Sequence, residues 1–102
     1  MILRALGVFA RRHACKALEN IDKVTVFGSY ARGDFTPESD IDMVIDSGGK
    51  LKGIMFFVAS DEIAKALPVK VDVYEKREIK EGSMLCNEIN KEGVIIYEKE
   101  RF

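Results

Sequence analysis

Three aspartates are spaced so that their carboxylates could hold divalent cations. Asp40 and Asp42 alternate with apolar residues in the strand-like run 40–46, and Asp72 has the same setting in the run 69–74. Residues two apart on a strand are ~6.5 Å apart along its axis, so two such carboxylates can bind one cation or bridge two. An acid pair of this kind, taken alone, is also typical of a solvent-facing edge strand. Three strand acids that could converge favour a metal site.

A Gly-Ser pair follows the apolar run 23–27, which is predicted to be a strand. Gly28 permits a close backbone approach, and Ser29 is expected to cap a one-turn helix over 30–32 that ends at Gly33. A strand that runs into a helix N-terminus leaves N–H groups that can bind an anion such as phosphate. Taken alone, the pair is more typical of an ordinary capped turn.

Apolar periodicity predicts the elements that position these residues. Helical spacing predicts helices over 2–18, 53–67 and 83–91, and alternating or β-branched runs predict strands over 23–27, 40–46, 69–74 and 94–97. The interleaving of helices and strands indicates a two-layer or three-layer α/β domain. The buried side of the middle helix is expected to comprise Phe56, Phe57, Ser60, Ile63, Ala64 and Leu67.

Bulk composition limits the classes of function. The 102 residues indicate one domain over 1–102, and the net charge of −1 lacks the basic excess typical of direct nucleic-acid binding. Cys15 and Cys86 show no paired or metal-ligand spacing and are expected to be buried thiols in a reducing cytosol. No secretory leader and no run of roughly 18 apolar residues is present, so we expect a cytoplasmic protein without a membrane contact.

The combined motifs resemble the DNA polymerase beta-type nucleotidyltransferase superfamily. Its pattern is a Gly-Ser pair, a further Gly a few residues later, and an acid-any-acid pair that opens the next strand. The segments 28–33 and 39–42 match that pattern in residue type and spacing. More narrowly, the reading Gly-Ser-Tyr-Ala-Arg-Gly and the segment 90–98 resemble the minimal nucleotidyltransferases, small proteins encoded beside a helical HEPN-domain protein. The resemblance implies a mixed four-stranded sheet with helices packed mainly on one face, the polymerase beta palm-like fold.

The resemblance also implies a role for six residues. Asp40, Asp42 and Asp72 would be the catalytic acids and would bind Mg²⁺, with two ions expected. Asp72 would also help to deprotonate the acceptor. The residues that hold the nucleotide phosphates would be Gly28, Ser29 and Arg32.

The function implied by the resemblance is transfer of AMP from ATP to a hydroxyl. The expected acceptor is a tyrosine of a HEPN-domain toxin, so the protein would act as an antitoxin. The alternative is a non-catalytic interaction module that neutralises its partner by binding, because the chain has no added domain to grip an acceptor. Nucleotidylation of a small molecule would need a second pocket, and polymerisation onto nucleic acid would need a basic surface.

Overall fold

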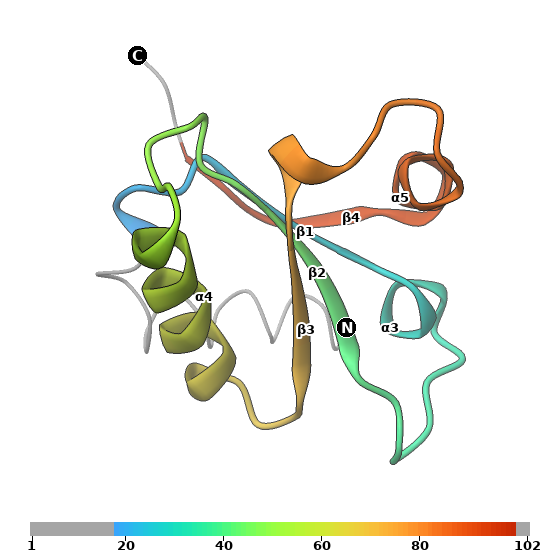
Figure 1. Ribbon diagram of the computed structural model, residues 1–102. Coiled ribbons are helices and arrows are strands. Elements are labelled where there is room, and N and C mark those ends of the chain that lie inside the picture. Colours follow the sequence, from blue (N-terminus) through green and yellow to red (C-terminus); the bar gives the residue numbers. More distant parts are fainter. Residues whose placement is uncertain (1–17, 100–102) are drawn as a thin grey trace.

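A computed structural model describes residues 18–99 (Figure 1). The predicted helix 2–18 lies outside this range except for its last residue. The other predicted elements are present within about two residues of their expected ends. In chain order they are β1 (Lys23–Phe27), α3 (Ser29–Arg32), β2 (Ile41–Asp46), α4 (Ile54–Ala66), β3 (Val71–Glu75), the 3₁₀ turn η1 (Lys76–Glu78), α5 (Met84–Glu92) and β4 (Val94–Glu98).

The four strands form one sheet in the order β3-β2-β1-β4. β1 runs antiparallel to both β2 and β4, whereas β2 and β3 are parallel. A parallel pair requires a crossover connection, and α4 provides it between β2 and β3. The prediction of an α/β domain with a mixed four-stranded sheet is therefore confirmed.

One face of the sheet carries the hydrophobic core. Ile41, Met43 and Ile45 of β2 are 0%, 0% and 1% exposed, as the alternation predicts, and they pack in one cluster with residues of β1 and α4. α4 covers this face with Ala59, Ser60 and Ile63. The Ser60 hydroxyl donates a hydrogen bond to the Phe56 carbonyl at 2.8 Å, which satisfies this polar group inside the core.

The prediction that Phe57 belongs to the core is wrong. Its side chain is 71% exposed, although the neighbouring Phe56 is partly buried and packs against the core. At about 100° per residue, Phe57 lies roughly 120° around the helix from Ile63, which is the most buried residue of α4. The core therefore takes a narrower stripe of the helix than expected, and Ile54, Met55, Phe57 and Val58 form an exposed apolar patch.

The opposite face of the sheet carries Asp42, Val44 and Asp72, and we call it the acid face. α3 follows β1 at one end of this face, and α5 packs beside it (Figure 1). Phe27 and Val44 are 2% and 4% exposed on this side. Among residues 18–99 the helices are therefore less one-sided than the resemblance implies, with α4 on the core face and the shorter α3 and α5 on the acid face.

Candidate active site

Asp42 and Asp72 are direct neighbours on the acid face. They are register partners on the parallel strands β2 and β3, and Phe27 of β1 is paired with Asp42 in the same row. Register partners project from the same face of a sheet, and adjacent strands are about 4.8 Å apart. The structure thus brings together two acids that are 30 residues apart in the sequence.

Asp40 lies one residue before β2 begins, at the open end of the same strand. Its Oδ2 is 3.7 Å from Nζ of Lys70, the residue before β3. Ile41 N–H donates a hydrogen bond of 2.9 Å to the Lys70 carbonyl, which fixes the start of β2 against the start of β3. We call the pair Asp42 and Asp72 the acid row. Asp40 therefore lies at the end of the acid row, beside Lys70, which was not predicted as a site residue.

The Gly28 turn closes directly onto Asp42. Gly28 has φ 75° and ψ −152°, a backbone conformation that L side chains rarely adopt. A Cβ at this position would also collide with Oδ2 of Asp42. The close approach predicted at Gly28 is therefore present. The group that lies against Gly28 is the carboxylate of Asp42.

Ser29 is not the helix cap that the sequence predicts. α3 begins at Ser29 itself, Gly28 takes the N-cap position, and no side-chain hydrogen bond caps the helix. Within the described residues the Ser29 hydroxyl makes no hydrogen bond. Gly33 ends the turn in the left-handed conformation with φ 88°, as predicted.

Arg32 points toward two carboxylates of α5 and one carboxylate in the loop that follows α3. Its Nη1 donates to Oε2 of Glu92 at 2.9 Å and lies 3.7 Å from Oε1 of Glu88, while Nε donates to Oδ2 of Asp34 at 3.2 Å. The hydrogen bonds to Glu92 and then to Asp34 raise the pKa of Arg32. The side chain links α3 to α5 at the edge of the acid face and is engaged there by anions of the chain itself.

Burial and like charges raise the pKa of Asp42. Burial is the largest cause, followed by repulsion from Asp72, Glu88 and Asp40, while Arg32 acts in the opposite direction. Tyr74 of β3 responds to the same surroundings, because burial and then Asp42, Asp72 and Glu88 raise its pKa. A raised pKa from burial plus specific charge partners is typical of functional sites.

Sequence reasoning missed two members of this environment, Tyr74 and Glu88. Tyr74 follows Asp72 by two residues on β3, so strand alternation places both side chains on one face, and this alternation was the available signal. Glu88 comes from α5, whose position over the acid face follows from tertiary packing. No local sequence pattern predicts that placement.

The donor chemistry of the acid row fits magnesium. Among residues 18–99, no three His, Cys, Asp or Glu side chains converge closely enough to hold a metal ion by themselves. Mg²⁺ is usually bound by one or two carboxylates together with substrate phosphates and water. Neighbouring carboxylates on β2 and β3 beside the Gly28 turn are donors of the type that Mg²⁺ prefers, and they would hold it together with substrate phosphates and water.

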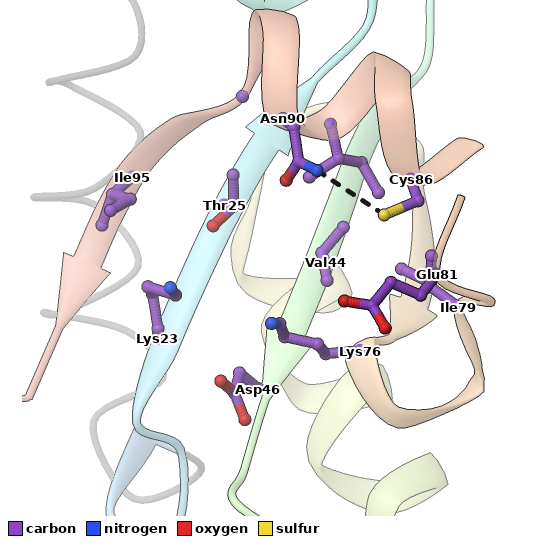
Figure 2. A pocket seen from close by; sticks show the side chains of 12 residues that line it. Lys23, Thr25, Val44, Asp46, Lys76, Ile79, Glu81, Cys86, Asn90 and Ile95 are labelled. Atoms are coloured by element: carbon purple, nitrogen blue, oxygen red, sulfur yellow. Dashed lines mark hydrogen bonds between the residues drawn. The ribbon is translucent and has the colours of Figure 1, made fainter. Parts of the chain in front are cut away.

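A separate pocket lies farther along the acid face, on the other side of Val44 (Figure 2). Its volume is about 540 Å³, and its walls come from β1, β2, β4, α5 and the segment after β3. Charges of both signs line it, and Asn90 donates a hydrogen bond to the Cys86 sulfur at 3.6 Å. The pocket contains none of the predicted site residues. Its charged and polar residues include Lys23, Asp46, Lys76, Glu81 and Asn90.

Comparison with known proteins identifies the family. The sequence pattern of the family described as Polymerase beta, Nucleotidyltransferase matches residues 12–102. The chain belongs to this nucleotidyltransferase family. The prediction that it is an enzyme of the nucleotidyltransferase class is thereby confirmed.

Two relatives have informative names. A protein of Methanocaldococcus jannaschii, named as a candidate protein adenylyltransferase, is 34% identical over 71 residues, which cover 68% of this chain and 83% of that protein. The protein adenylyltransferase MntA of Thermococcus cleftensis is 32% identical over 63 residues, covering 61% of this chain and 63% of the relative.

Solved structures share the fold of this nucleotidyltransferase. A toxin–antitoxin crystal structure with AMP-PNP has a TM-score of 0.69 at 22% identity, covering 95% of this chain and 74% of that chain. A tri-AMPylated HEPN toxin of Shewanella oneidensis in complex with MNT antitoxin gives 0.66 at 18% identity, covering 95% and 73%. Within the described part of this chain, no helix is long and apolar enough to cross a membrane.

Proposed function

We propose that this nucleotidyltransferase transfers AMP from ATP to a tyrosine hydroxyl of a HEPN-domain toxin, in a magnesium-dependent reaction, and so acts as an antitoxin. The observation that carries the proposal is the row formed by Asp42 and Asp72 beside the Gly28 turn. The names of the relatives support adenylyl transfer to protein, and the fold neighbours are toxin–antitoxin complexes.

Each part of the site has a role in this proposal. The Gly28-Ser29 turn holds the β- and γ-phosphates through backbone N–H groups and the Ser29 hydroxyl. Asp40, Asp42 and Asp72 hold Mg²⁺, which when bound neutralises charge on the attacking and leaving oxygens. Asp72 also accepts the proton of the acceptor hydroxyl, because β3 places it on the side of the row away from the phosphate turn.

Arg32 supplies positive charge to the phosphates in this proposal. Its present partners Asp34 and Glu92 are surface carboxylates, and exposed ion pairs of this kind are worth little. The phosphates of a bound nucleotide can therefore compete for the guanidinium. The same bonds keep Arg32 at the edge of the site before the nucleotide enters.

The proposal is tested by incubating the protein with α-labelled ATP, Mg²⁺ and a HEPN-domain toxin from the same organism. We expect label on the HEPN protein, and loss of that label with Asp42→Asn. Asp61→Asn is the matched control, because Asp61 pairs with Lys65 on the exposed side of α4. Absence of transfer by wild-type protein that binds ATP would contradict the proposal.

A non-catalytic antitoxin is the second candidate. The exposed apolar patch on α4, with Ile54 77% and Phe57 71% exposed, favours it, because such patches often mark protein interfaces. The double variant Asp40→Asn/Asp42→Asn separates the two functions. Neutralisation of the toxin that persists in this variant supports binding alone, whereas neutralisation that is lost while the complex still forms supports chemistry.

A further inference from the structure

Tyr74 is a nucleophilic side chain on the acid face that the proposed mechanism does not use. It lies on β3 two residues after Asp72, so both side chains project from the same face. Its register partner on β2 is Val44, one step along the strand pair from the Asp42–Asp72 row.

The Tyr74 ring reaches across β2 beside Asp42. Its centroid is 5.5 Å from that of Phe27, with the planes tilted by 54°. Phe27 belongs to β1, two strands away from β3, and is the register partner of Asp42. Strands are about 4.8 Å apart, so the rings of Tyr74 and Phe27 meet over β2, at the stretch that contains Asp42 and Val44. The contact with Phe27, which is 2% exposed, holds the ring in that position.

The Tyr74 hydroxyl has no hydrogen-bond partner within residues 18–99 and is not completely buried. No buried side-chain oxygen in this range lacks a hydrogen bond, so the unbonded phenol oxygen is not a buried atom. Tyr30 differs, because it is buried and stacks on Phe35. Tyr97 also differs, because its hydroxyl donates to the Leu18 carbonyl at 3.4 Å.

We propose that the Tyr74 hydroxyl is a self-modification site that accepts AMP within its own active site. The inference rests on the proposed adenylyl transfer from ATP. In the step, the Tyr74 Oη–phosphorus bond forms at the α-phosphate, and the bond from that phosphorus to the bridging oxygen breaks. Pyrophosphate leaves with the electron pair, and the phenol proton passes to Asp72. Holding the hydroxyl beside the reacting centre makes the transfer unimolecular, which favours it over a collision with a free acceptor.

Self-modification is limited to one event per chain and stops further transfer. AMP attached to Tyr74 lies over Asp42 and occupies the place of the next nucleotide. An external acceptor that reaches the acids first takes the AMP instead. The reaction therefore restrains the enzyme when its protein acceptor is absent.

The test uses the isolated wild-type protein with α-labelled ATP and Mg²⁺, followed by mass spectrometry of the peptide that contains Tyr74. We expect label to approach one AMP per chain on that peptide. Tyr74→Phe keeps the ring against Phe27 and is expected to remove the label. Tyr97→Phe is the matched control and is expected to label like wild type. Each protein is also incubated with the HEPN-domain toxin used to test the proposed function.

The outcomes separate this inference from the proposed function. Label on the HEPN protein without label on the wild-type chain overturns self-modification and leaves the proposed function standing. Undiminished self-label in Tyr74→Phe overturns the assignment to this residue. Absence of label on both proteins overturns both proposals. In the supporting outcome, Tyr74→Phe also transfers AMP to the HEPN protein for longer than wild type does after preincubation with ATP.

Discussion

One face of β2 contributes to the hydrophobic core, and the other face contributes to the charged candidate site. Ile41, Met43 and Ile45 point into the core and are almost completely buried, whereas Asp42 on the other face lies among like charges. The core residues lower the free energy of the fold by burying apolar surface. Asp42 raises it, because its charge is partly desolvated and repelled. The comparison predicts that substitutions on one face change stability and substitutions on the other change chemistry.

The largest expected effect is on the acid face. Asp72→Asn removes the proposed proton acceptor and metal ligand, and loss of a general base lowers rates roughly 10²–10⁴-fold. The fold should persist, because Asp72 makes no recorded hydrogen bond or ion pair in the described part of the chain and carries like charge beside Asp42. Label transfer and the melting temperature measure the two quantities. A large drop in melting temperature would show that the acid face also supports the fold.

The complementary change is Met43→Ala on the core face. Met43 is 0% exposed, and such truncations cost about 2–5 kcal/mol in the free energy of unfolding. Chemical denaturation measures the loss. Transfer by the fraction that remains folded should stay close to wild type. A loss of specific activity as large as that of Asp72→Asn would mean that the core sets the geometry of the acids directly.

Gly28→Ala should lower both the stability of the fold and the rate of transfer. The new Cβ collides with Asp42, and the φ of 75° is strained for alanine. Strain of this kind costs about 1–3 kcal/mol, and displacement of Asp42 should lower transfer as well. Gly33→Ala is the control, because it also has a positive φ of 88° but no atom lies within 4 Å of its added Cβ. We expect Gly33→Ala to lose stability while it keeps most of its activity.

The raised pKa of Asp42 predicts a pH-dependent difference in stability. The folded state holds the proton more tightly than the unfolded state, so Asp42 destabilises the fold as the pH rises through its folded-state pKa. In the absence of metal, Asp42→Asn should therefore melt above wild type at neutral pH, and the difference should vanish toward roughly pH 4. Melting curves over this range provide the measurement. A constant difference would contradict the electrostatic explanation.

The smallest expected effect comes from the link between α3 and α5. Glu92→Gln weakens the bond to Arg32, and exposed pairs contribute about 0–1 kcal/mol to stability. The freed guanidinium should bind phosphate more readily, so we expect a modest decrease in KM for ATP with little change in kcat. An increase in KM would show that Glu92 positions Arg32 for the nucleotide instead of competing with it.

Local pattern was sufficient for most of the fold. Alternation in the run 40–46 identified both the core side and the acid side of β2. The ends of the other described elements were predicted from the positions of glycine and proline and from the spacing of apolar residues. The pattern failed where three-dimensional packing decided the outcome. Phe57 is as apolar as Phe56 but is exposed, and Gly28, which lies against Asp42, takes the N-cap position that was predicted for Ser29.

The candidate site could be predicted in part for the same reason. Spacing along the chain selected Asp40, Asp42 and Asp72, and the register of β2 and β3 places two of them side by side. The surroundings of Asp42 could not be predicted, because the charge of Glu88 comes from α5 and the Tyr74 ring of β3 contacts Phe27 of β1. These contacts depend on how α5 and the aromatic rings pack over the sheet.

The position of β3 at the edge of the sheet determines the route of access to the acids. Within residues 18–99, β3 pairs with β2 alone, and α5 lies over the opposite side of the acid face near β1. In this described part of the chain, α5 therefore covers the acid row on the β1 side. On the other side the row ends beside Asp72 at the unpaired edge of β3. In the proposed reaction the acceptor side chain would approach Asp72 from this edge, and within residues 18–99 no further strand there restricts the size of the protein that carries it.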